Sequence, residues 1–123
     1  MNLILTIFYM VIVFILSVVK APGGEDPFRG FDKVLHFLAY GLMGLLWIRV
    51  LLARGYRGVG GGRQRGVVFK ALLITFLYGL IIEFVQGLLP AREASIFDAI
   101  ANGLGSAAGI ALYYLLDRCI RLS

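Results

Sequence analysis

The sequence predicts an all-α fold, a bundle of four transmembrane helices, from three observations. Of the 123 residues, 60% are hydrophobic and only 15% are charged, against about 45–50% and about 25% in soluble domains. The apolar residues fall in long blocks, and the mean hydropathy is +0.90. The connections between these blocks are short and rich in Pro, Gly and charged residues. A small soluble core could not hide so many apolar side chains, so we expect an integral membrane protein.

The first predicted span, residues 3–19, is close to the shortest apolar length that crosses a bilayer. A cleaved signal peptide is the alternative interpretation of such a stretch. This one lacks a basic region before it, and Pro22 directly follows Ala21, the only plausible small residue at a cleavage site. We therefore interpret the stretch as a retained span.

The second predicted span covers residues 34–53 and follows a polar connection over residues 20–31. Residues 54–66 are rich in glycine and arginine, which predicts a flexible, basic loop. The third span, residues 67–89, ends before Pro90, because proline cannot continue a helix. A short turn over residues 91–95 leads to the fourth span, residues 96–116. Together the four spans form a single predicted membrane domain over residues 1–123.

The charge distribution predicts the orientation of the chain. Short loops rich in Lys and Arg stay on the cytoplasmic side of a membrane, which places the loop over residues 54–66 and both termini inside. The net charge of +5 does not predict a nucleic-acid partner, because no stacking aromatic residues are interleaved with the basic ones. The single Cys119 excludes an intrachain disulfide. We expect a multi-pass protein of the bacterial cytoplasmic (inner) membrane.

Polar residues are predicted to converge near the outer ends of three spans. The second span contributes Asp32, Lys33, His36 and Tyr40, the third contributes Glu83 and Gln86, and the fourth contributes Asp98 and Asn102. At 1.5 Å rise per residue, His36, Glu83 and Asn102 fall within roughly 5–10 Å of the outer boundary. Polar groups in apolar spans are costly unless they are paired or functional. This convergence is the main functional signal in the sequence.

Two stretches, DKVLHFLAYG and IIEFVQGLLPAREASIFDAIANGLGSAAG, resemble the conserved regions of VanZ-like membrane proteins. The family pattern is Asp-Lys-x-x-His-x-x-x-Tyr, then Glu-x-x-Gln, a Pro-x-Arg turn and Asp-x-x-x-Asn-x-x-Gly. The resemblance covers about residues 32–116 and includes Arg92, a candidate that the short turn over residues 91–95 already places beside the converging polar groups. It implies a protein of the cell envelope, linked to glycopeptide antibiotic resistance through a family member that lowers teicoplanin sensitivity.

The candidate residues allow two interpretations. In the first, the protein binds a cell-envelope lipid or a glycopeptide-related amphiphile in an outward-facing polar pocket, and Lys33 and Arg92 hold an anionic headgroup. In the second, a membrane enzyme performs acid–base hydrolysis or transfer on an envelope lipid precursor, with His36, Glu83 and Asp98 as catalytic groups. In both interpretations the predicted ligand-binding residues are Asp32, Lys33, Tyr40, Gln86, Arg92 and Asn102. We favour binding, because the sequence contains no complete pairing of nucleophile and base.

Asp32, His36, Glu83 and Asp98 could also ligate a divalent metal ion. Because no compact ligand motif such as H-E-x-x-H is present, we expect no metal and no other cofactor. The expected partners are membrane lipids and a lipid-linked envelope precursor.

The fourth predicted span carries a G-x-x-x-G step at Gly105 and Gly109. Such steps let helices approach closely, so this span is the predicted centre of the bundle, and the same face offers a surface for oligomerisation.

Overall fold

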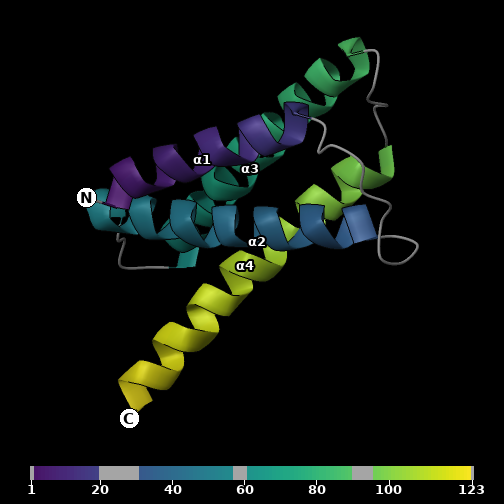
Figure 1. Cartoon of the computed structure of the whole chain (residues 1–123). Helices are drawn as coiled ribbons and strands as arrows, with labels where there is room; N and C mark the ends of the chain where they lie inside the picture. The colour runs from purple at the N-terminus through teal and green to yellow at the C-terminus, as the bar shows by residue number, and fades with distance from the viewer. Residues whose placement is uncertain (1, 20–30, 57–60, 90–95, 123) are drawn as a thin grey trace.

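A computed structural model of the chain describes residues 2–19, 31–56, 61–89 and 96–122 (Figure 1). The helices are α1 (Asn2–Val18), α2 (Phe31–Leu51), a short π-helical turn η1 (Leu52–Tyr56), α3 (Gly61–Leu88) and α4 (Ile96–Leu122). These described ranges contain no strand, so the predicted all-α class with four long helices is confirmed. The predicted connections over residues 20–31 and 91–95 lie outside the described residues except for Phe31, which begins α2.

The helices are those of a multi-pass membrane protein. Three apolar segments are long enough to cross a membrane: Lys33–Arg54, Arg65–Leu88 and Ile96–Leu122. A shorter apolar helix covers Leu3–Val18. All four carry large apolar side chains on their exposed faces, among them Phe8, Leu38, Phe84 and Leu104. Apolar side chains on the outside are expected where lipid surrounds the protein in place of water.

Three helices extend beyond the predicted spans, and α2 does so by beginning at Phe31. α3 begins at Gly61 and η1 covers Leu52–Tyr56, so the prediction of one continuous loop over residues 54–66 is wrong. Arg and Gln are good helix formers, so α3 continues past the apolar segment into its basic flank. α4 similarly continues to Leu122, where Asp117 Oδ2 lies 3.0 Å from Arg121 Nε at i, i+4 spacing. Apolar length therefore predicts a span but not where its helix ends.

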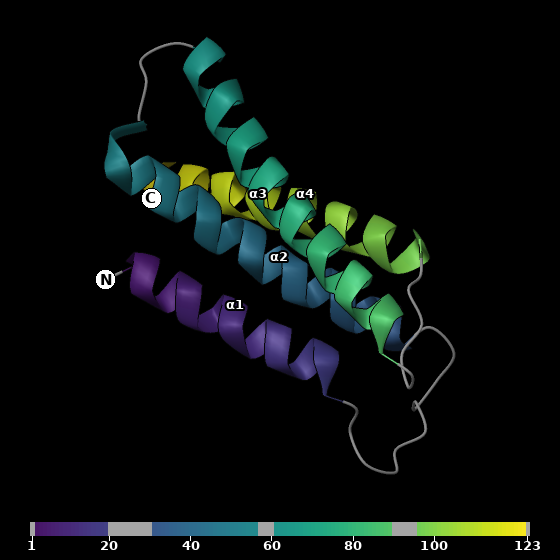
Figure 2. The ribbon, with the colours of Figure 1, turned by 90° about the horizontal axis from the view of Figure 1, so that it is seen from above.

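α2 and α3 share the centre of the structure. Each contacts the three other long helices, whereas α4, among the described residues, contacts α2 and α3 but not α1. Figure 2 shows α1 along one side of α2, with α3 and α4 on the other. The prediction that the fourth span is central is wrong, because α4 packs closely on α2 but does not reach α1 in the described part of the chain. The buried residues Tyr40, Met43 and Ile48 of α2 face different neighbours in two separate apolar clusters.

The tightest contact joins α2 to α4 along a seam of small residues: Gly41, Gly44, Gly105, Ser106 and Gly109. A Cβ atom on Gly105 would overlap the carbonyl oxygen of Phe37, and one on Gly109 would overlap that of Gly41. A Cβ on Gly44 would lie 2.6 Å from the carbonyl oxygen of Ser106. The predicted close approach is confirmed. Because α2 covers this face within the chain, oligomerisation through Gly105 and Gly109 stays a prediction.

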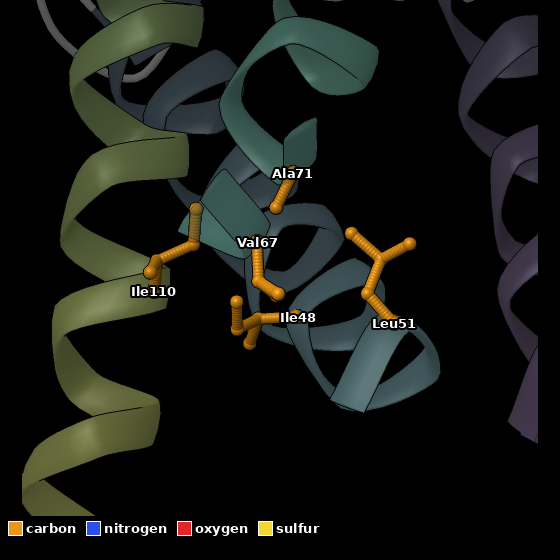
Figure 3. Close-up of a cluster of buried hydrophobic side chains, with 5 residues drawn as sticks. All are labelled: Ile48, Leu51, Val67, Ala71 and Ile110. Carbon is orange, nitrogen blue, oxygen red and sulfur yellow. The ribbon is translucent and has the colours of Figure 1, made fainter. Parts of the chain in front are cut away.

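Apolar side chains fill the bundle at the end where α2 finishes and α3 begins. The cluster there consists of Ile48, Leu51, Val67, Ala71 and Ile110 (Figure 3). A second cluster, made of Val13, Tyr40, Met43 and Ile82, attaches α1 to α2 and α3. The predicted site residues lie toward the opposite end of the bundle, where α2 and α4 begin.

Candidate functional site

The four helices alternate in direction, which brings polar residues of three helices together (Figure 1). The starts of α2 and α4 lie at the same end of the bundle as the last turns of α1 and α3. The residues that meet there form what we call the polar cluster: Lys33, His36, Glu83, Asp98 and Asn102. The predicted convergence of polar groups from three spans is thus present in the structure.

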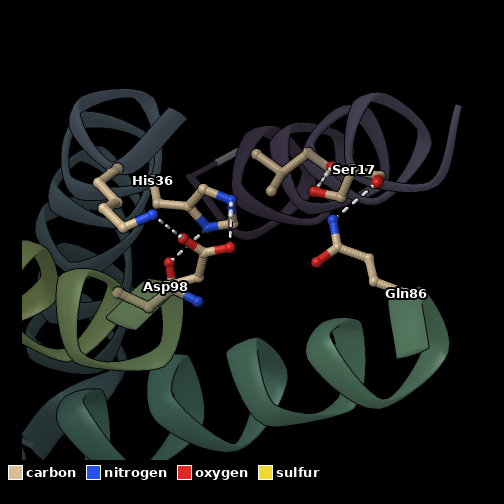
Figure 4. A network of polar contacts seen from close by, with 7 residues as sticks. Ser17, His36, Gln86 and Asp98 are labelled. Carbon is tan, nitrogen blue, oxygen red and sulfur yellow. Dashed lines mark hydrogen bonds and ion pairs between the residues drawn. The ribbon is translucent and has the colours of Figure 1, made fainter. Parts of the chain in front are cut away.

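His36 connects α2 to two residues of α4 (Figure 4). Its Nδ1 lies 2.9 Å from Asn102 Oδ1, and its Nε2 lies 3.9 Å from Asp98 Oδ2. An amide oxygen can only accept a hydrogen bond, so the Nδ1–H group donates to it. Asp98 also pairs with Lys33, whose Nζ lies 3.6 Å from Oδ1.

Two carboxylates of the polar cluster are buried. Glu83 is 6% exposed and Asp98 is 5% exposed, whereas the side chain of Lys33 is 48% exposed. One ligand-type atom each of His36, Glu83 and Asp98 lies within 4.8 Å of the other two. Burying carboxylates this close together is costly unless cations, protons or hydrogen bonds compensate. This concentration of buried charge distinguishes the polar cluster from ordinary helix packing.

Tyr40 and Gly79 border the polar cluster. The Tyr40 ring is 1% exposed and stacks parallel to the His36 ring, with 6.4 Å between their centroids. A Cβ on Gly79 would lie 3.0 Å from Asn102 Nδ2 and 3.1 Å from Tyr40 Cε1. Gly79 of α3 therefore leaves the room that these two side chains occupy. No pattern in the sequence predicts the contact of this glycine with the site residues.

A cavity of about 210 Å³ lies beside the polar cluster, between α1, α2 and α3. Its lining residues are Val13, Leu16, Ser17, Leu35, His36, Ala39, Tyr40 and Gln86. Gln86 Nε2 donates a hydrogen bond of 2.8 Å to the carbonyl oxygen of Ser17, which ties α3 to α1 at this point (Figure 4). His36 takes part in both the cavity and the polar cluster.

The contribution of α1 to the cavity was not predicted. Val13 and Leu16 are ordinary apolar residues of a predicted span, and no pattern distinguishes them from their neighbours. Ser17 was the one available signal, as a hydroxyl residue near the end of that span.

The predicted site residues fall into two groups. Seven gather at this end of the bundle: Lys33, His36, Tyr40, Glu83, Gln86, Asp98 and Asn102. Asp32 belongs to the first turn of α2, but its side chain is not among those described. Arg92 lies outside the described residues. The predicted cationic pair of Lys33 and Arg92 therefore stays a prediction, and the described partner of Lys33 is Asp98.

Fold and site together define a multi-pass membrane protein with buried polar groups gathered at one end of its helices. A family model described as VanZ/LLP1 matches residues 1–117. The chain therefore belongs to the VanZ/LLP1 family, which confirms the VanZ-like resemblance noted in the sequence. The match also includes the first helix, which lies outside the resemblance over residues 32–116.

One curated relative is an uncharacterized protein of Schizosaccharomyces pombe. It is 30% identical over 117 residues, which cover 94% of this chain and 65% of the relative. The chain thus spans slightly less than two thirds of the relative's length. No solved structure matches the chain.

Proposed function

We propose that the protein binds a membrane amphiphile in the cavity between α1, α2 and α3. The observation that carries this proposal is the composition of the cavity wall. Val13, Leu16 and Leu35 offer apolar contacts, while His36 and Gln86 offer polar groups at one side. Pockets that combine an apolar wall with a few polar groups favour ligands that carry both kinds of surface.

The size of the cavity limits which part of the amphiphile enters. Its volume of about 210 Å³ is below the 300–1,000 Å³ typical of pockets that enclose a whole small molecule. A headgroup or a short chain segment would fit, but not a complete phospholipid. The exposed residues Leu16 and Leu35 lie at the rim, where the remaining chain could follow the lipid-facing surface of α1 and α2.

The charge near the cavity supports an anionic headgroup. The half-exposed ammonium group of Lys33 lies one helical turn from His36, and Arg92 is the second cation that we propose for this site. The relative in a yeast supports a ligand class shared by bacterial and eukaryotic membranes, such as a phospholipid.

A narrower form of the proposal follows the VanZ-like resemblance. In it, the ligand is a lipid-linked envelope precursor or a glycopeptide-related amphiphile, and binding contributes to glycopeptide resistance. That form assumes a bacterial cytoplasmic membrane, both termini inside and the polar cluster facing outward.

Filling the cavity tests the proposal. Ala39 lines it, so Ala39→Leu adds three carbon atoms inside the cavity. Ala108→Leu makes the same change on the exposed face of α4 and is the matched control. We expect native mass spectrometry to find co-purified lipid on the wild type and on Ala108→Leu, and much less on Ala39→Leu at unchanged helix content. Equal lipid on all three proteins would contradict the proposal, and the adduct mass identifies the lipid class.

Membrane enzymology is the second candidate function. It is favoured by one observation, the imidazole and two carboxylates within 4.8 Å of one another beside the cavity. Such groups can exchange protons with a bound substrate. If the protein is an enzyme, the wild type should convert the lipid identified above, and Glu83→Gln should bind that lipid without converting it. If neither the wild type nor Glu83→Gln converted the lipid, the enzyme proposal would be contradicted and the binding proposal would stand.

A further inference from the structure

We propose that His36, Glu83 and Asp98 form a binding site for a divalent transition-metal ion. The three residues come from α2, α3 and α4, and their ligand-type atoms lie within 4.8 Å of one another. Around a tetrahedral ion with bonds of about 2.0–2.2 Å, ligand atoms are about 3.3–3.6 Å apart. Shifts of about 1 Å would therefore complete the coordination geometry. Because the ligands come from three helices, they form no compact sequence motif. For that reason the sequence analysis predicted no metal.

The orientation of His36 is the first argument that the site suits a metal ion. Asn102 Oδ1 accepts from Nδ1, so Nε2 faces the carboxylate side of the polar cluster and is the ring nitrogen that can bind a metal ion. At 3.9 Å, Nε2 and Asp98 Oδ2 are too far apart for a hydrogen bond, but both can bind one ion placed between them. Histidines that ligate metals are commonly oriented in this way, by an acceptor that binds the other ring nitrogen.

Buried polar groups around the polar cluster are the second argument. Among the described residues, the Tyr40 hydroxyl and Asn102 Nδ2 have no hydrogen-bond partner, although each residue is 1% exposed. Both border the same glycine, Gly79. A metal ion with three protein ligands keeps at least one further coordination position, which water usually fills. Ordered water bound to the ion would give these two buried groups partners.

The donor set indicates the class of ion. A neutral imidazole and two carboxylates together carry two negative charges, which one divalent cation balances. Imidazole favours Zn²⁺, Fe²⁺, Ni²⁺ and Cu²⁺, and carboxylates favour Mn²⁺ and Mg²⁺, so Zn²⁺ and Mn²⁺ suit the mixed set. Lys33 is half-exposed and can move away from Asp98 when the ion binds. The site does not depend on the proposed lipid, because its ligands converge whether or not the cavity is filled.

Metal content is the direct test. The full chain, purified in detergent, is stripped with EDTA, incubated separately with Zn²⁺ and Mn²⁺, freed of excess ion and analysed by plasma mass spectrometry. We expect about one ion per wild-type chain and loss of the ion in Asp98→Asn and Glu83→Gln. Asp117→Asn is the matched control and should keep the ion, because Asp117 pairs with Arg121 near the far end of α4. Neither ion on the wild type, or equal content in Asp98→Asn, would overturn the proposal.

Two further measurements keep the test decisive if a charge variant fails to fold. His36 is the only histidine, so ¹⁵N-histidine labelling gives one pair of ring signals, and Zn²⁺ should move the Nε2 signal of the wild type. A signal that stays in place at saturating Zn²⁺ would overturn the proposal. Asn102→Ala removes the acceptor for Nδ1 while leaving all three ligands, so metal affinity should fall by about 10–100-fold. Unchanged affinity would contradict the role given to Asn102.

Discussion

The α2–α4 seam and the attachment of α1 show two different ways of holding helices together in lipid. At the seam, backbone touches backbone, and there is no space for a Cβ on Gly105 or Gly109. α1 is held by polar side chains that donate to backbone carbonyl groups: Tyr9 to Ala39, Tyr78 to Met10 and Gln86 to Ser17. Lipid is as apolar as leucine, so close packing and hydrogen bonds replace the hydrophobic effect between membrane helices. The difference teaches that four of the five residues of the polar cluster lie on the tightly packed pair, with Glu83 added by α3, while α1 forms a wall of the cavity through side-chain contacts.

The largest effect should come from closing the seam. In Gly109→Ala, the new methyl group overlaps the carbonyl oxygen of Gly41, and backbone cannot move aside as a side chain can. We expect a loss of unfolding free energy of about 3 kcal/mol, measured by denaturant titration of the helix signal in detergent micelles.

Gly66→Ala is the control for the glycine substitution itself. A Cβ there meets nothing within 4 Å. Alanine is the better helix former, so this variant should gain about 0.5–1 kcal/mol. If Gly109→Ala and Gly66→Ala were equally stable, the seam would not have the importance that the geometry assigns to it.

A smaller effect should follow from Gly79→Ala, which crowds the polar cluster from the side of α3. Its methyl group would lie 3.0 Å from Asn102 Nδ2, so the Asn102 side chain must shift by a few tenths of an ångström. Crowding costs about 1–3 kcal/mol and the helical gain of alanine returns about 0.5–1 kcal/mol, so the net loss should be about 1 kcal/mol.

The clearer readout for Gly79→Ala is the ring of His36. Its ¹⁵N Nδ1 signal should move, because that nitrogen donates to Asn102. Gly103→Ala, where the nearest atom is Phe76 Cδ2 at 3.8 Å, should leave the signal in place. An unmoved signal in Gly79→Ala would mean that Asn102 adjusts without disturbing the histidine.

The smallest effect should come from loosening α1. Tyr9→Phe removes the hydroxyl that donates to the Ala39 carbonyl at 2.6 Å and leaves the ring in place. Hydrogen bonds between membrane helices average about 0.6 kcal/mol, so amide exchange in α1 should accelerate about threefold.

Tyr114→Phe is the matched control on α4. Its buried hydroxyl has no hydrogen-bond partner among the described residues, so removing it should cost nothing. Faster exchange in α1 with this variant, or unchanged exchange with Tyr9→Phe, would contradict the account of how α1 is held.

The fold could be predicted from apolar length, but the helix ends and the neighbours could not. The apolar blocks located four helices because lipid requires helical backbone wherever a segment crosses it. The start of α3 at Gly61 lies outside that constraint, in a basic flank where local propensity decides. The shared central position of α2 and α3 depends on how the four helices pack in three dimensions. The spacing of Gly105 and Gly109 predicts that α4 has a face for close packing, but it does not say which helix lies against that face.

The site could be predicted in part. His36, Glu83, Asp98 and Asn102 were found because each is polar within an apolar span, and alternating helix directions bring them to one end. Two features were missed. The apolar residues of α1 that line the cavity look like any lipid-facing residue, and the contact of Gly79 with Asn102 depends on the crossing of α3 and α4. The functional roles of the site residues stay predictions.

The α2–α4 seam also affects how the chain is made. Its tightest contact joins helices that are not consecutive, since α3 is synthesised between them. The ribosome synthesises α2 and α3 before α4, so the contacts of Phe37 and Gly41 with Gly105 and Gly109 cannot form until α4 is made. The contacts of His36 with Asn102 and Asp98 also form only then. Final assembly therefore begins only when α4 emerges, and release of the chain from the insertion machinery before that moment would leave buried polar groups facing lipid.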